Sequence, residues 1–512
     1  MAIDPNEPLR RAKQMLEIIL SKDKARLDRI DSYMRGEHDD PYMPREADDE
    51  YRLLASRSTS NWFPLLVGTP AQACYVDNFR PGRDLDDSET KITPEWKHWQ
   101  ESRLDSRQAA IYRGALTFGH SFTVTEKDER SGKVLTRGLS ARRTAALFED
   151  PANDDAPVWA LTITRMPQVE LLSQARSKGQ AILPESDLLG HGRMWNEDSV
   201  WEFTFEGQER VFLQQVRLHG ASSCPVTRFV ASVDLEGRTV GVVEPMIPLQ
   251  NRINQTIFDL LVAQTYNSTK VRWVTGMAPP IRMKNANAGN PDLEPEWVAD
   301  LDENGQPQPL PLKSPNRRFM FASSPDTKFG QLDETPLDGF IQSIDMSIRH
   351  LSAISQTPPH YLLGQIANLS ADALQAAEIS LARKIDEFKA SFGESWERVF
   401  RIAAELTGEA ASADDYTGEV IWRDMEGRSL AAAADGLGKL KEQLQIPAEG
   451  LWGDVPGVTQ NKLREWKKLK EEQDADLAQQ DALYRAAGSL SGSTRGGQPA
   501  INNPRTPPED LR

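Results

Sequence analysis

The strongest constraint in this sequence is one uninterrupted apolar stripe between Leu374 and Leu406. Its members recur every three or four residues, the interval that places side chains on one face of an α-helix. Ser370 is a favoured N-cap and Gly408 a favoured helix end. The pattern predicts one helix over residues 370–406, about 55 Å long. We expect its apolar face to belong to an internal core, with a coiled-coil seam as the alternative. The stripe comprises Leu374, Ala377, Leu381, Ile385, Phe388, Phe392, Trp396, Val399, Ala403 and Leu406.

Two further apolar stripes predict a pair of helices on either side of a proline-rich segment. One stripe covers residues 249–261 and the other residues 337–351. Between them, residues 275–325 hold nine of the 33 prolines and show little periodicity, which is typical of a small loop-rich module. Pro358 and Pro359 must end the second helix. Residues 355–369 are therefore expected to form a loop with an exposed apolar tip.

The rest of the chain predicts an α+β protein that is predominantly helical. Residues 121–243 favour strands, with a hairpin at residues 130–133 and a helical interlude near residues 169–178. Helices are predicted over residues 8–33 and residues 426–487. The last 25 residues, 488–512, are rich in Gly, Ser and Pro and are expected to be disordered.

The charge balance argues against tight binding of nucleic acid. The chain has 60 Lys and Arg against 76 Asp and Glu, a net charge of -16. Neutralising phosphates requires clustered basic residues, so composition alone favours a protein that never meets DNA. An acidic chain still suits a task in which DNA must slide past without sticking. The N-terminus lacks a signal-peptide core and no apolar stretch is long enough to span a bilayer, so we expect a soluble intracellular protein.

No motif predicts catalysis, a metal site or a cofactor. The two cysteines, Cys74 and Cys224, have no metal-ligand spacing around them and are expected to be buried thiols. Residues 119–123, GHSFT, resemble a nucleophile elbow, but Thr123 replaces its last glycine and a helix precedes the strands. Ser121 is therefore expected to lie in a helix-to-strand turn. Neighbouring acids, as at residues 48–50 and 86–87, are more often a solvated surface than a Mg²⁺ site.

An ordered set of segments across nearly the whole chain resembles portal proteins of tailed double-stranded-DNA bacteriophages, of the long-tailed type common in actinobacterial phages. VEPMIPLQNRIN at residues 243–254 is the most telling run. The others are YMRGEH (33–38), NWFPLLV (61–67), VDNFR (76–80), YRGALTFGHS (112–121), SQTPPHYLLG (355–364), NLSADAL (368–374) and LWGDVPGVTQ (451–460). No single run is diagnostic, and the ordered set makes the resemblance specific.

The resemblance implies a portal fold with wing, stem, clip and crown parts that forms a ring of twelve subunits. The implied parts are a wing of N-terminal helices and β-rich region (1–247), a first stem helix (248–274), a clip (275–330), a second stem helix (331–354), a tunnel loop (355–369), a long wing helix and following segment (370–425), a crown (426–487) and a disordered tail (488–512).

The resemblance also implies candidate site residues. Those lining the channel on the stem are Asp338, Gln342, Asp345 and Arg349. Those of the tunnel loop near DNA are Leu362, Leu363, Gly364, Gln365, Ile366, Ala367 and Asn368. Those of the clip that contact partners are Trp297, Phe319 and Phe321.

By the same resemblance, the chain is a structural subunit and not an enzyme, with no catalytic residue, metal or cofactor. Its ring would sit at a capsid vertex of the virion, after assembly in the host cytoplasm, and serve DNA packaging and ejection. Expected partners are other copies of the chain, double-stranded DNA passing non-specifically, the terminase large subunit, the head-tail adaptor, and the major capsid and scaffolding proteins, with no membrane. Two alternatives stay open: another phage connector or tail ring component, and a metal-dependent nuclease with a buried acidic cluster.

Overall fold

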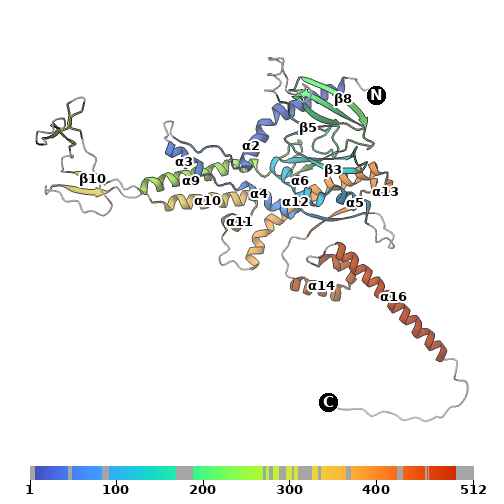
Figure 1. The fold of residues 1–512 in the computed structure, drawn as a ribbon. Coiled ribbons are helices and arrows are strands. Elements are labelled where there is room, and N and C mark those ends of the chain that lie inside the picture. Colours follow the sequence, from blue (N-terminus) through green and yellow to red (C-terminus); the bar gives the residue numbers. More distant parts are fainter. Residues whose placement is uncertain are drawn as a thin grey trace, which may run out of the picture.

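The protein is a mixed helix-and-strand fold with a broad body and a long projection (Figure 1). The computed structural model describes residues 6–43, 49–82, 92–168, 188–268, 272–275, 281–287, 294, 296–302, 305–308, 326–331, 336–364, 371–423, 430–455, 458 and 460–491. The helical interlude predicted near residues 169–178 and the tail from residue 492 lie outside these residues.

The body contains two antiparallel sheets. The larger has the order β4-β5-β6-β7-β8 and the smaller the order β3-β2-β9. The predicted hairpin is confirmed, since β2 pairs with β3 and Lys127 lies opposite Val134. Phe122 and Val124 of the small sheet pack with Ala160 of the large one, so the two sheets share a core. The strands are β2 (His120–Lys127), β3 (Val134–Leu139), β4 (Thr144–Leu147), β5 (Trp159–Arg165), β6 (Gly190–Trp195), β7 (Ser199–Glu206), β8 (Arg210–Leu218) and β9 (Val226–Val230).

The predicted N-terminal helix is divided into two. α1 (Glu7–Glu17) is followed by a π-helical turn (Ile18–Lys22) and then by α2 (Lys24–Met34). Side chains of α1 pack in the cluster of the large sheet, whereas those of α2 pack in the main core. The prediction of one continuous helix was wrong because the π turn shifts the apolar face so that each half meets a different core.

A glycine at the end of α6 (Leu104–Phe118) turns the chain into β2. Gly119 has φ 92°, and a Cβ added there would lie 2.9 Å from the backbone of Thr239, so only glycine fits. Ser121 follows and is buried, with its hydroxyl donating to the Ile111 carbonyl at 2.9 Å. The predicted helix-to-strand turn is therefore present at Gly119, but Ser121 lies just beyond it as the second residue of β2.

The long helix α12 (Ala371–Thr407) agrees with the predicted helix to within a residue at each end. One side of it is fixed to β9 by polar contacts. The Ser391 and Ser395 hydroxyls donate to the carbonyls of Val230 and Arg228. Arg398, 7% exposed, donates to the carbonyls of Val226 and Cys224 and to the hydroxyls of Thr227 and Ser223, all within 3.3 Å. These bonds anchor the helix to the small sheet along its C-terminal half.

The apolar side of α12 fills the main core. Phe392, Trp396 and Phe400 are almost fully buried, and the Trp396 Nε1 donates to the Tyr112 hydroxyl at 2.6 Å. The predicted internal core face is therefore confirmed for this part of the stripe. The elements around it include α4 (Phe63–Ala73), α5 (Pro94–Glu101), α13 (Ala410–Ala413) and the two-stranded sheet of β1 (Val76–Arg80) and β14 (Glu419–Trp422).

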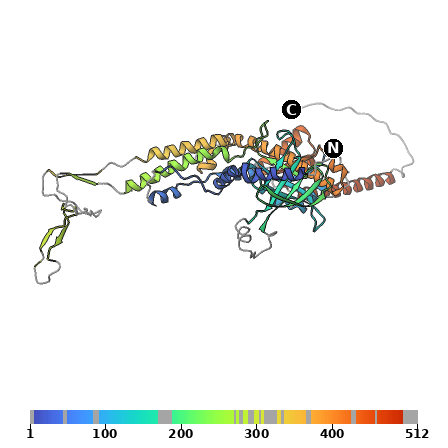
Figure 2. The same cartoon turned by 90° about the horizontal axis from the view of Figure 1, so that it is seen from above.

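The projection is a row of helices with strands at its far end (Figure 2). A 3-10 turn (Glu244–Met246) leads into α9 (Ile247–Ser268), which lies between α3 (Asp49–Arg57) and α10 (Asp338–Ser355) in both views. At the distal end β10 (Arg272–Thr275) pairs with β13 (Lys328–Gln331), and β11 (Met283–Asn285) pairs with β12 (Trp297–Ala299).

Residues after β14 form a separate group of helices. These are α14 (Leu430–Leu444), α15 (Ala448–Leu451), a 3-10 turn (Trp452–Asp454) and α16 (Gln460–Ser491). An edge-to-face contact between Trp452 and Trp466 and an ion pair between Glu449 and Lys470 hold the start of α16 against α15.

Candidate functional site

The outer helix of the projection, α10, carries the four residues predicted to line a channel. Asp338, Gln342, Asp345 and Arg349 recur along one exposed side of the helix. The Asp345 carboxylate lies 3.7 Å from the Arg349 guanidinium, and their side chains are 50% and 69% exposed. A pair this exposed adds little stability. The structure thus brings the four residues together in one solvent-facing stripe, which we call the charged stripe.

The base of α9 is held by a buried polar network. Gln250 and Asn254 are nearly fully buried and hydrogen-bonded to each other at 2.9 Å. The Gln250 amide donates to the Ser60 carbonyl, and the Asn254 amide contacts His38 Nδ1 at 2.8 Å. Because these buried side chains are hydrogen-bonded to one another and to residues of the body, they attach the base of the projection rigidly to the body.

The junction after α10 is a short helix and not the loop that was predicted. Residues Pro359–Leu363 form α11, because proline is well suited to the first turn of a helix. Leu362 is 4% exposed and belongs to the main core, so its predicted place in an exposed tip was wrong. Leu363 is half-buried and Gly364, with φ 65°, ends the helix.

Several predicted residues cannot be placed. Gln365, Ile366, Ala367 and Asn368 of the predicted tunnel loop, and Phe319 and Phe321 of the predicted clip, lie outside the described residues. Trp297 lies on β12 at the distal end, and 63% of it is exposed.

A lysine of the long helix caps α10. Lys384 Nζ donates to the carbonyl of Ser355, the last residue of α10, at 2.8 Å. Burial lowers the pKa of Lys384, and its ammonium lies 5.8 Å from the Phe388 ring centre. The signal in the sequence is a lysine on the apolar face of a predicted helix, between Leu381 and Phe388. A cation at a helix C-terminus stabilises the exposed carbonyls there.

Replacing Lys384 by methionine is expected to loosen this junction. The change keeps the buried stem but removes a charge-assisted hydrogen bond, an interaction of about 1.5–3 kcal/mol. Amides of the last turn of α10 and of α11 should then exchange with deuterium roughly ten- to hundredfold faster. Arg383→Met is the matched control, because Arg383 is exposed on the same helix. Equal exchange in both variants would contradict the capping role.

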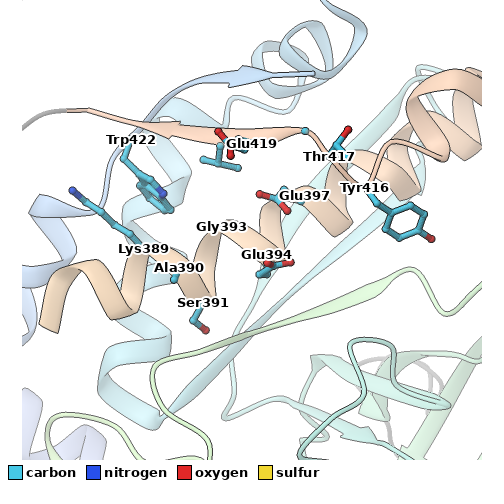
Figure 3. Close-up of a pocket in the computed structure, with 12 residues that line it drawn as sticks. Lys389, Ala390, Ser391, Gly393, Glu394, Glu397, Tyr416, Thr417, Glu419 and Trp422 are labelled. Atoms are coloured by element: carbon cyan, nitrogen blue, oxygen red, sulfur yellow. The ribbon is translucent and has the colours of Figure 1, made fainter. Parts of the chain in front are cut away.

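A shallow groove lies between α12 and β14 (Figure 3). It has a volume of about 630 Å³ and carries Glu394, Glu397 and Glu419. Burial, and then the neighbouring Glu394, raise the pKa of Glu397. Its one serine, Ser391, donates its hydroxyl to a backbone carbonyl. Across the described ranges, no three His, Cys, Asp or Glu side chains are placed to hold a metal ion, and no helix is long and apolar enough to cross a bilayer.

Comparison with known proteins identifies the class of this fold. Two relatives are named portal protein, one from Mycobacterium phage L5 and one from Mycobacterium phage D29. The first is 25% identical over 425 residues and the second 26% over 431, each alignment covering 80% of this chain and 78% of the relative. The similarity is therefore to phage portal proteins, which are structural proteins of the virion.

The family follows from a second match. The model of the phage portal protein family, SPP1 Gp6-like, matches residues 16–476. The chain belongs to this family. The resemblance seen in the sequence is confirmed. Of the three interpretations left open, the comparisons support the portal subunit. A portal subunit of this family belongs to a ring at the capsid vertex.

Proposed function

We propose that this chain forms a ring of twelve subunits through which double-stranded DNA is packaged and later ejected. One observation carries the proposal: two antiparallel helices, α9 and α10, project from the body and bear a strand-rich module at their far end (Figures 1 and 2). With their connecting module, they correspond to the stem and clip implied by the family. The β-rich body would be the wing and the helices from residue 430 the crown.

The charged stripe of α10 is proposed to face the channel. The helices α9 and α10 carry two arginines, Arg252 and Arg349, against three aspartates, Asp259, Asp338 and Asp345. Twelve chains of net charge -16 carry -192 in total. A wall of this kind repels phosphate weakly along its whole length, which keeps DNA centred and mobile.

The segment between α11 and α12 is proposed to approach the DNA. Residues 365–368 carry no charge, so they would contact DNA through shape and not through ion pairs. The Lys384 cap and the buried Leu362 support this assignment, because they give the segment a firm base. The distal module, including Trp297, would contact the terminase large subunit during packaging and the head-tail adaptor afterwards.

The remaining partners follow from the position of the ring. Assembly in the host cytoplasm would join the portal to the scaffolding and major capsid proteins at a single vertex. Negative-stain electron microscopy of the purified chain tests the central idea. We expect end-on views of a ring with a central hole, and side views with a narrow projection. A monodisperse monomer at high concentration, without rings, would contradict the proposal.

A further inference from the structure

The projection of one subunit is a row of three helices, and a different helix lies at each edge of the row. α9 lies in the middle, α3 on one side and α10 on the other (Figures 1 and 2). Tyr51 of α3 contacts Phe258 and Tyr266 of α9, with ring centres 6.3 and 6.2 Å apart. On the other side, His350 of α10 is hydrogen-bonded to Arg252 of α9 at 3.0 Å. Both outer helices therefore pack against α9.

α10 has a third face beside its buried face and its charged stripe. We call it the uncharged shoulder, and it consists of Gly339, Ser343, Met346, Ala353 and Ile354. All five are exposed, and Met346 and Ile354 are each 58% exposed. Helical spacing puts the charged stripe between this shoulder and Ile341, which is 55% exposed. Small residues alternating with two large apolar ones form a surface that a second helix can approach closely.

The side of α3 that faces away from α9 also carries an exposed apolar side chain. Tyr51, Leu54 and Ala55 face α9, whereas Leu53 on the opposite side is 48% exposed. Its neighbour Arg52 has a side chain 72% exposed, and its nearest charged contact is Asp49 at 3.6 Å on the same helix. The outward face of α3 thus presents one large apolar side chain with an exposed cation beside it.

We propose that, in the ring, the uncharged shoulder of α10 packs on the outward face of α3 from the neighbouring subunit. The inference rests on the proposed ring and specifies which surfaces of neighbouring subunits are in contact. In a closed ring every subunit repeats the same head-to-tail contact, so the two ends of each row must fit each other. Met346 and Leu53 form the apolar centre of this contact.

Charge favours the same arrangement. Chains of net charge -16 repel one another, so their contact surfaces need to be uncharged or oppositely charged. The shoulder has no carboxylate, and the residues of the charged stripe that lie nearest to it by helical spacing are Gln342 and Arg349.

Paired cysteines test the contact. In one chain, residues 53 and 346 lie on helices at opposite ends of the row, so a cross-link between them joins two copies. The native Cys74 and Cys224 do not interfere, because both are 1% exposed and burial raises the pKa of each thiol to about 12. Rings of Leu53→Cys/Met346→Cys treated with a short bismaleimide should give a ladder of covalent oligomers. The matched control, Leu53→Cys/Ile341→Cys, should give at least about tenfold less product.

The outcomes separate this inference from the proposed function. Intact rings that give no ladder, or that give equal ladders with both pairs, would overturn the contact while leaving the portal ring in place. Absence of rings in the unmodified chain would instead overturn the proposed function.

Charge substitutions give a second measurement. Met346→Glu should raise the protein concentration needed for half-maximal ring formation at least about tenfold, because it buries a carboxylate at the centre of the contact. Leu53→Lys in the same chain should restore assembly. Ile341→Glu, which changes the net charge equally, should leave assembly unchanged. Loss of rings in the Ile341 variant but not in the Met346 variant would contradict the proposed contact.

Discussion

Replacing Trp396 by alanine is expected to lower the free energy of unfolding of the body by about 3–5 kcal/mol. The side chain is fully buried, and its ring centre lies 4.7 Å from that of Phe229 and 4.9 Å from that of Trp99. It thereby joins α12 to β9 and α5. Its Nε1 also donates to the Tyr112 hydroxyl of α6. Removing the ring leaves a cavity where four elements meet.

Denaturant unfolding followed by circular dichroism measures this loss. Trp297→Ala is the matched control, because Trp297 is 63% exposed and its loss should change stability by no more than about 0.5 kcal/mol. Trp396→Phe keeps an aromatic ring but removes the indole donor, so we expect a smaller loss of about 1–2 kcal/mol. If both alanine variants were equally stable, Trp396 would not be the centre of this core.

The second large effect is expected in DNA packaging, from Asp338→Lys combined with Asp345→Lys. Each chain loses two negative charges and gains two positive ones on the charged stripe, and the pair of Asp345 with Arg349 is lost. Lysines on the wall would form ion pairs with phosphates, so DNA would stick where it should slide. We expect the yield of packaged DNA to fall at least about tenfold, and less so at high salt, with the ring still visible by electron microscopy.

Glu209→Lys combined with Glu236→Lys is the control for total charge. Both side chains are at least 74% exposed and lie on the body, so this variant changes the net charge equally but leaves the projection unaltered. It should package DNA normally. Asp338→Asn with Asp345→Asn removes the negative charge without adding cations and should give an intermediate yield. Normal packaging by the lysine variant would reject the repelling wall.

Local periodicity predicted the long elements well because their apolar faces are continuous. The predicted long helix corresponds to α12, and the predicted Gly408 follows its last residue. The second projecting helix begins at Asp338 and ends at Ser355, close to its predicted stripe. In both cases a large part of the stripe packs in the main core, from Ile385 to Phe400 in α12 and from Ile344 to Leu351 in α10, so the pattern there reports on the packing.

Prediction failed where packing changes partner within a few residues. The first helix switches cores at its π turn, and the first projecting helix ends at Ser268 because the chain then enters β10. β10 pairs with β13, which follows more than fifty residues later, and no local signal reveals such a partner. Pro359 was interpreted only as a helix breaker, although proline also begins helices, as it does in α11.

The candidate site residues divide in the same way. The charged stripe was visible from spacing alone, since it needs only one helix. Lys384 and Arg398 were missed because their roles depend on the elements they touch, the end of α10 and the strand β9. A lysine or arginine on an otherwise apolar helix face is the signal that would have found them.

The pairing of β10 with β13 has a consequence for how such a chain can vary. The polypeptide leaves α9 and returns to α10 through one narrow two-stranded neck, with Arg272 opposite Gln331. Whatever lies beyond that neck can be lengthened, shortened or exchanged for another sequence while the distance between the two helices stays the same. Under the proposed function, a virus that acquires a different motor or tail would need to change this distal piece alone and would inherit the rest of the subunit unchanged.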